Sequence, residues 1–391
     1  MKKTIASISS CLLFLTMIFA VWDCTRQPKQ IKDNSFVENK SKRINVYIEN
    51  SGSMKGYFVG NSQIKDIIKD YYDRISEKQD NQDTITLNYI NTGIENYEKD
   101  IKRYLANTQA RCTASFTKID DILSTAMKGC NDTTVNIVVS DFCFTSNDGS
   151  LAMAASGITS LFSEQMKSNS GLSIAIIKYM SDFKGKFFPG GIPCNKPLPF
   201  YIWIFGNATE VKQIANLPIK NENCGKLLLQ PKQFINYRII SKKARMIDGD
   251  AIIVKEWDKN RGRGFSCSRQ EDSDEYVVNI EADLSSVILS EDEIVNNQNY
   301  KINDGYTIKS IKRDKEEKYV YTISTQKPSP GYILIDYSLD ILPQWIDDSN
   351  YVGTGLPKDS TTLGIKDLIT GVYDAYHNNS KEYFSIKITL K

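Results

Sequence analysis

The feature that most constrains the fold is the apolar run from Val135 to Val139. A strand of this kind is buried on both faces, as in a sheet that helices cover on both sides. Other strand-like runs alternate with helical patterns before and after it. The strand-like runs are 44–48, 84–90, 172–179 and 200–205, and the clearest helical stripe is Ile64, Ile67, Ile68, Tyr71, Tyr72 and Ile75. The sequence therefore predicts an α/β domain over residues 44–222, with a doubly wound, mostly parallel sheet.

The pattern changes past about Cys224, where short strand-like runs are separated by polar turns. These runs are 238–241, 251–256, 276–282, 306–311, 319–324, 332–337 and 384–390. Such spacing is typical of an antiparallel sandwich, so we predict a mainly antiparallel, β-rich domain over residues 225–391. One late helix is expected within it, with Ile365, Leu368, Ile369, Val372, Tyr373 and Tyr376 on its inner face.

The first 24 residues have the pattern of an export signal. Lys2 and Lys3 precede an apolar run from Cys11 to Trp22 that is short for a membrane span, and Cys24 follows directly. We interpret residues 1–24 as a lipoprotein signal peptide with lipidation at Cys24, and an uncleaved N-terminal anchor is the alternative. Residues 25–43 are polar and predict a flexible tether. The expected location is the bacterial cell envelope, anchored to the membrane and either periplasmic or surface-exposed.

Charge and cysteine content exclude several classes of function. The chain has 49 basic and 47 acidic residues, which does not favour nucleic acid as a partner, and no phosphate-binding glycine motif indicates a nucleotide. A single histidine and the absence of a Cys-x-x-Cys pair argue against structural zinc and haem. The cysteines past Cys24 permit disulfides in an exported protein. We expect Cys112 and Cys143 to lie near one edge of the sheet, as either a disulfide or two free buried thiols.

Oxygen-bearing side chains gather where predicted strands end. Glu49, Ser51 and Ser53 follow the first strand, Asp141 follows the strand at 135–139, and Thr117 precedes that strand. Ligands of open α/β sheets bind beyond the carboxyl ends of the strands. Carboxylate and hydroxyl oxygens suit a hard cation, so the sequence predicts one Mg²⁺ ion, or Mn²⁺ or Ca²⁺, at this edge.

This arrangement resembles a von Willebrand factor A domain and its metal-ion-dependent adhesion site. That family has the pattern Asp-x-Ser-x-Ser, a distant threonine, and a later aspartate at a strand end. Ser51 and Ser53 match the two serines, Thr117 the threonine and Asp141 the second aspartate, while Glu49 replaces the first aspartate. Either Glu49 reaches the ion directly or through water, or the site has lost its metal and Glu49 accepts hydrogen bonds from the turn.

The resemblance covers about residues 43–219 and implies a protein-binding role without a chemical step. In such a site, an acidic side chain of a protein partner replaces a water on the ion. We therefore expect a metal-dependent adhesion or assembly module and no enzyme. A metal-assisted hydrolase would require further acidic ligands, for which Asp120, Asp121 and Asp148 are the nearby candidates. A metal-free structural scaffold of an envelope complex is the third hypothesis.

A serine hydrolase is not favoured by the sequence. Ser53 lies outside a Gly-x-Ser-x-Gly turn, and the only histidine, His377, is expected to be solvent-exposed at the end of the late helix. Thr117 and Asp120 also have the spacing of a helix capping box.

Overall fold

The computed structural model describes residues 41–78, 83–97, 100–144, 150–187, 190–240, 246–247, 276–339, 342–353, 355–356, 360–377 and 381–390. The predictions for residues 1–24 with Cys24, the tether as far as Lys40, the strand at 251–256, Asp148 and Cys267 lie outside these ranges. None of the helices in the described ranges is long and apolar enough to cross a membrane.

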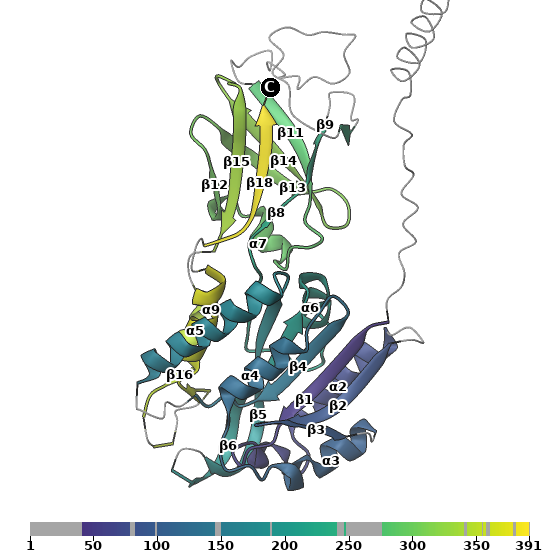
Figure 1. The fold of residues 1–391 in the computed structure, drawn as a ribbon, viewed down its shortest axis with the longest axis vertical. Coiled ribbons are helices and arrows are strands. Elements are labelled where there is room, and N and C mark those ends of the chain that lie inside the picture. The colour runs from purple at the N-terminus through teal and green to yellow at the C-terminus, as the bar shows by residue number, and fades with distance from the viewer. Residues whose placement is uncertain are drawn as a thin grey trace, which may run out of the picture. The chain divides into compact units, whose positions relative to one another are not determined.

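The largest sheet of the described chain has seven strands in the order β3-β2-β1-β4-β6-β5-β7 (Figure 1). Its strands are β1 (Arg43–Glu49), β2 (Thr84–Ile90), β3 (Ile94–Tyr97), β4 (Thr134–Ser140), β5 (Ser173–Phe187), β6 (Ile192–Gly206) and β7 (Gly225–Leu229). β1 pairs in parallel with β2 and β4, and the other pairings are antiparallel. Four strands, β1, β2, β4 and β5, consequently run in one direction. The α/β prediction is confirmed at this level, as a mixed sheet.

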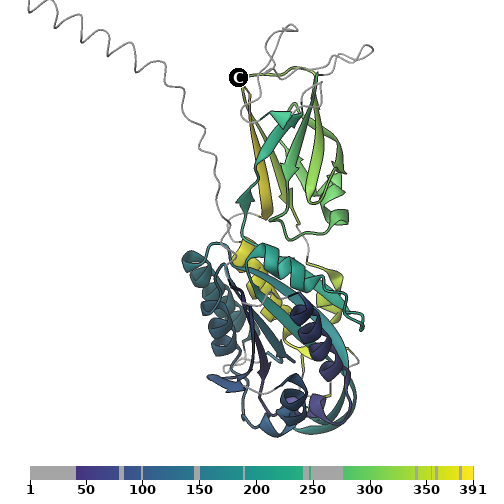
Figure 2. The same ribbon diagram turned by 90° about the vertical axis from the view of Figure 1, so that its right-hand side faces the viewer.

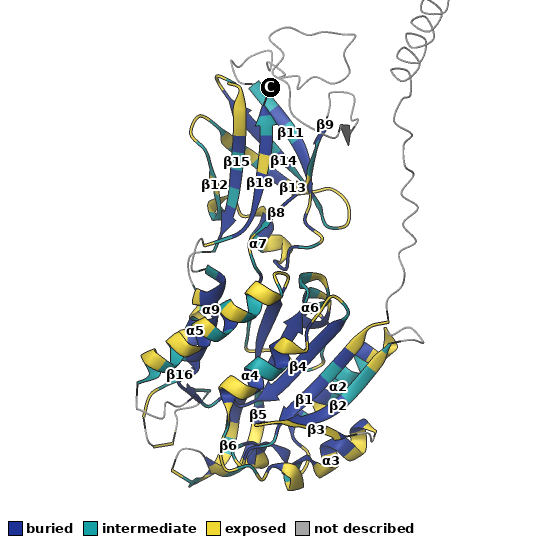
Figure 3. Cartoon of the chain, viewed as in Figure 1, coloured by how far each residue is buried: buried dark blue, intermediate teal, exposed yellow. Residues whose placement is uncertain are grey.

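Helices cover both faces of this sheet, as Figure 2 shows from the side. They are α2 (Gln63–Glu77), α3 (Ile101–Arg111), α4 (Ile119–Lys128), α5 (Leu151–Ser168), α6 (Ala208–Ala215), α9 (Ile365–His377) and the 3₁₀ helix η2 (Met54–Phe58). Successive side chains of β1 point to opposite faces of the sheet. Ile44, Val46 and Ile48 pack in the core beneath α2, whereas Tyr47 packs in the core beneath α4 and α5. Figure 3 shows the resulting buried interior of the sheet.

The predicted helical stripe is confirmed in α2 for Ile64, Ile67, Ile68, Tyr71 and Ile75, which are buried, while Tyr72 is half-buried. The expected capping box is wrong. The N-cap of α4 is Lys118 and has no side-chain hydrogen bond, because the Thr117 hydroxyl bonds to Glu49 instead.

The long β5–β6 hairpin is the main departure from the predicted alternation of strands and helices. β6 lies antiparallel between β4 and β5, so the run at 200–205 is not a further parallel strand. Its outer half contains Pro193, Pro197 and Pro199, which lack a donor for a sheet. These prolines are separated by even numbers of residues, so their backbone nitrogens, which carry no hydrogen, all face the same side of the strand. That side is the one away from β5, since Pro199 offers its carbonyl to the Tyr57 hydroxyl at 2.6 Å.

The β-rich region contains a five-stranded and a four-stranded sheet, ordered β10-β9-β11-β14-β13 and β12-β15-β18-β8. Their elements are β8 (Gln233–Phe234), β9 (Tyr237–Ile240), β10 (Met246–Ile247), β11 (Tyr276–Asp283), α7 (Glu291–Val295), η3 (Asn297–Asn299), β12 (Tyr300–Ile302), β13 (Thr307–Arg313), β14 (Lys318–Thr325), β15 (Gly331–Ser338) and β18 (Glu382–Leu390). Most pairings are antiparallel, as predicted, and β18 with β8 is the parallel exception among the described strands of these two sheets.

Part of the C-terminal region returns to the first sheet. The returning elements are α8 (Gln344–Asp348), β16 (Asn350–Tyr351), β17 (Thr362–Leu363) and α9. α9 packs so closely on α5 that a Cβ on Gly371 would lie 2.5 Å from the carbonyl oxygen of Ala155. The Thr159 hydroxyl also donates to the Gly371 carbonyl at 2.9 Å. β7, α8, β16, β17 and α9, whose residues were expected in the β-rich domain, therefore contribute to the α/β layers.

Candidate metal site

Two loops form the base of the candidate site at the carboxyl ends of β1 and β4. The turn after β1 is held against the 112–118 loop by Gly52 N–H donating to Ala114 O at 2.9 Å and by Ala114 N–H donating to Asn50 O at 3.1 Å. This pairing is a short parallel bridge between Ser51 and Ala114. It fixes the position of the loop that carries Thr117 next to the serines of the turn.

Glu49 is fully buried at the centre of the site. Its Oε1 accepts a hydrogen bond from the Thr117 hydroxyl at 2.9 Å, and its Oε2 accepts one from the Ser140 hydroxyl at 2.8 Å. The Ser51 hydroxyl contacts the same carboxylate, and Ser51 Oγ lies 2.8 Å from Ser53 Oγ. The parallel register explains Ser140, because Ile48 lies opposite Val139 and the next residues of the two strands are neighbours.

Asp141 lies at the end of β4 and is 4% exposed. Its Oδ1 accepts the Cys143 N–H at 3.2 Å, and the Ser53 hydroxyl bonds to the carboxylate. Phe142, between Asp141 and Cys143, has a φ of +46°, which is uncommon for a residue with a side chain. The buried Phe142 ring stacks on Trp203 at a centroid distance of 4.4 Å, and this packing holds the strained turn in place.

Burial and charge change the acidity of this cluster. Burial and, to a smaller degree, the nearby Asp141 raise the pKa of Glu49 to about 7, against the lowering effect of the hydroxyls of Ser51, Ser140 and Thr117. Burial also raises the pKa of Asp141, against the hydrogen bonds from Ser53 and Cys143. Two buried carboxylates therefore face each other across hydroxyl groups, and both are costly to ionise together.

The donor set fits a hard cation. No described lysine, arginine or histidine makes an ion pair with Glu49 or Asp141, so their negative charge is uncompensated by protein. Within the described ranges, no three histidine, cysteine, aspartate or glutamate side chains are grouped to hold a metal ion. A cation at this site would thus depend on hydroxyl oxygens beside the two carboxylates, which is the chemistry of Mg²⁺, Mn²⁺ or Ca²⁺.

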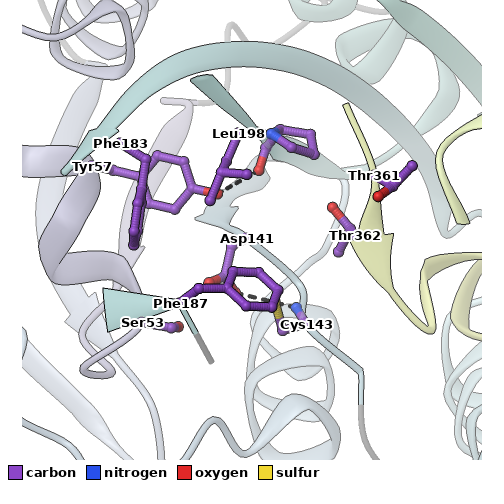
Figure 4. Close-up of a pocket in the computed structure, with 10 residues that line it drawn as sticks. Ser53, Tyr57, Asp141, Cys143, Phe183, Phe187, Leu198, Thr361 and Thr362 are labelled. Carbon is purple, nitrogen blue, oxygen red and sulfur yellow. Dashed lines mark hydrogen bonds between the residues drawn. The ribbon is translucent and has the colours of Figure 1, made fainter. Parts of the chain in front are cut away.

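A small cavity of about 10 Å³ adjoins the site, which is room for about one water molecule. Ser53, Asp141 and Cys143 lie on one side of it, and Thr361 and Thr362 approach from the C-terminal segment, as Figure 4 shows. Apolar walls enclose the remainder, formed by Tyr57, Phe183, Phe187, Leu198 and Pro199. The site is therefore closed on this side.

All five residues predicted for the metal site come together, namely Glu49, Ser51, Ser53, Thr117 and Asp141. Sequence reasoning missed Ser140, although its position directly before Asp141 at the strand end was a usable signal. It also missed Thr361 and Thr362, for which the sequence carries no local signal.

The thiols near the site are not bonded to each other. Cys112 and Cys143 are both free cysteines, so the disulfide alternative is wrong. Burial, with smaller contributions from Glu49 and Asp141, raises the pKa of the Cys112 thiol to about 12. Such thiols stay protonated and are poor nucleophiles.

His377 is half-buried, and not exposed as predicted. Its ring stacks on Tyr373 at a centroid distance of 4.1 Å, and Nδ1 lies 2.9 Å from the Tyr373 carbonyl oxygen. This histidine therefore has a packing role at the end of α9.

Comparisons with protein-family models, with curated proteins and with solved structures find no match for this chain. The functional conclusion therefore rests on the geometry and chemistry of the site itself.

Proposed function

We propose that this protein is a metal-dependent protein-binding module of the bacterial cell envelope, which acts in adhesion or assembly. A lipid on Cys24 attaches it to the membrane, and its α/β part is a von Willebrand factor A-like domain. One observation carries the proposal. Three chain segments bring the hydroxyls of Ser51, Ser53, Thr117 and Ser140 around two buried carboxylates, which no described cationic side chain neutralises.

The residues that would hold the ion are Ser51, Ser53, Thr117 and Asp141, with Glu49 bound directly or through water. Mg²⁺ takes six oxygen ligands, and solvent completes what the protein leaves open. When bound, the cation offers an exchangeable position to a carboxylate of a protein partner. The protein's own hydroxyls orient the two carboxylates, and the buried surroundings strengthen their attraction for a cation.

The hydrolase alternative finds no support in the acidic residues near the site that the structure describes. Asp120 and Asp121 are in the first turn of α4 and are exposed, and no hydrogen bond joins either of them to the described residues of the site. Glu49 and Asp141 are the two carboxylates of the described cluster, which is sparse for metal-assisted hydrolysis.

Thermal unfolding with Mg²⁺, Mn²⁺ or Ca²⁺ tests the metal site. An ion that binds only the native state at a hundredfold excess over its Kd adds about 2.7 kcal/mol. We expect this gain for the wild type and for Asp121→Ala, a matched control with an exposed carboxylate outside the cluster. Asp141→Ala should lose the gain and still fold, because the residue follows the strand. A wild-type melting temperature that none of the three ions changes would contradict the metal-dependent function.

Partner binding needs a separate measurement. The wild-type chain and Asp141→Ala are used as baits in envelope extracts, with and without chelator. A partner that the wild type retains only without chelator, and that Asp141→Ala does not retain, supports the proposal. Partners that bind both baits equally in chelator favour the metal-free scaffold.

A further inference from the structure

An exposed aromatic side chain lies directly beside the candidate metal site. Phe116 is 71% exposed, although the next residue, Thr117, bonds to the buried Glu49. Ile94, which is 47% exposed, follows the turn at the end of β2. Single exposed apolar residues are common on protein surfaces. The position of these two, at the edge of the sheet that carries the site, makes them candidates for a binding surface.

The backbone holds Phe116 in this exposed position from both sides. Ala114 is paired to the turn after β1, and Asn91 bonds to the other end of the loop. The Asn91 amide donates to Phe116 O at 2.7 Å and accepts from Lys118 N–H at 3.1 Å. Asn91 also belongs to the β2–β3 turn, three residues before Ile94, so its side chain ties the loop that carries Phe116 to the turn that precedes Ile94. Little backbone entropy would be lost when a partner covers such a loop.

The charge around this surface favours an acidic partner. Lys55, in η2 and two residues after Ser53, is exposed and makes no ion pair with the described residues. Its charge acts on the buried Cys112 thiol at the base of the 112–118 loop. Lys118 is offset by Asp120 and Asp121 in the first turn of α4. A divalent cation would be balanced by the two carboxylates, so Lys55 is the positive charge of the described residues that remains near the turn after β1 and favours an acidic partner.

We propose that the protein partner presents a segment in which a carboxylate neighbours a large apolar side chain, with the carboxylate on the cation and the apolar side chain against Phe116 and Ile94. This rests on the proposed function and adds a specificity surface to it. An acidic residue alone would not distinguish one partner from another. An aromatic contact at the centre of an interface adds a contribution to the binding free energy that depends on the partner's sequence.

A phage-displayed library of random linear peptides tests this surface. The full chain is the target, Mg²⁺ is present during selection, and bound phage are eluted with chelator. We expect enriched peptides to contain Asp or Glu next to an aromatic or branched aliphatic residue. Replacing that acid by its amide should abolish binding, and replacing the apolar neighbour by serine should weaken it. A selection that yields no chelator-sensitive peptide, or peptides without this pair, would overturn the proposal.

Protein variants separate the surface from the metal site. Phe116→Ser should weaken binding of a selected peptide by about tenfold, and Ile94→Ser by a few-fold, since anchors of this kind are worth more than 1 kcal/mol. Phe234→Ser is the matched control, because that ring is 68% exposed on β8 in the β-rich region, and it should bind like the wild type.

The ion-dependent thermal shift of Phe116→Ser should be unchanged. A lost shift would instead place the defect in the metal site and leave the apolar surface without support. Wild-type affinity in Phe116→Ser would refute the surface while the proposed function stands. Phe116-dependent self-association in Mg²⁺, or Phe116-dependent binding to anionic vesicles, would show another occupant and refute the peptide proposal.

Discussion

Replacing the buried glutamate by its amide should remove a pH-dependent loss of stability in the metal-free protein. Glu49→Gln keeps the shape of the side chain and an acceptor for the Thr117 hydroxyl at 2.9 Å. The new amide can donate to Ser140, whose hydroxyl lies 2.8 Å from Oε2 in the wild type. The variant therefore tests the charge at the centre of the site with little change in packing.

The size of the effect follows from the pKa of Glu49. It rises from an ordinary value of 4.5 to about 7 in the folded protein. Below pH 4.5 the carboxyl is protonated in both the folded and the unfolded state, and the folded protein has its full stability. As the pH rises, the folded protein keeps this proton at a growing cost in free energy of unfolding, and the full loss is reached above the folded pKa of about 7. Since one pKa unit corresponds to 1.36 kcal/mol, the loss is up to about 3 kcal/mol.

Urea unfolding in chelator, from about pH 5 to about pH 8, measures this loss. The wild type should lose up to about 3 kcal/mol more than Glu49→Gln across this range, and the variant should be the more stable protein at the upper end. Glu95→Gln is the control, since Glu95 is exposed and pairs with Arg111, and it should follow the wild type. Equal pH dependence of the wild type and Glu49→Gln would refute the assignment of a buried, costly charge to Glu49.

Three further predictions concern packing, anchoring and thiols. Gly371→Ala should destabilise the protein by about 1–2 kcal/mol in thermal unfolding, because the added methyl group meets α5, whereas Gly157→Ala on α5 has open space and should not destabilise it. Cys24→Ser should move the protein from the membrane fraction to the soluble fraction, and a variant that still resists carbonate extraction would contradict the lipid anchor. Non-reducing peptide mapping should recover Cys112 and Cys143 as separate thiols, and a linked peptide would contradict the structure.

Local patterns were sufficient for the elements that build the centre of the sheet. The stripe of α2 and the runs of β1, β2 and β4 each bury an apolar face that is visible in the sequence. The candidate site followed from the same elements, because parallel strands end at one edge and their next residues carry oxygen. Glu49 and Asp141 were therefore predictable as neighbours before any contact was known.

The order of the strands was not predictable from these patterns. β5 and β6 pair over 15 residues each, yet only their inner halves are apolar enough to indicate a strand. The prolines of β6 lack N–H donors and argue against a sheet. That they all face one side of the strand becomes informative only when the neighbouring strand is known. The approach of Thr361 and Thr362 to the site is likewise a long-range contact, about which hydrophobic periodicity carries no information.

The return of the chain to its first sheet determines when that sheet can be completed. Ile158 and Phe162 on α5 are fully buried, and Phe162 contacts Tyr376 of α9 at a ring-centroid distance of 6.3 Å. Phe162 also contacts Phe205 of β6, but during synthesis α5 lacks its contact with α9 until residue 377 is available, after most of the β-rich region has been made. A fragment that stops near residue 222 would expose the same apolar surface and is expected to aggregate. A fragment for the unfolding experiments should therefore keep α9 together with the first sheet.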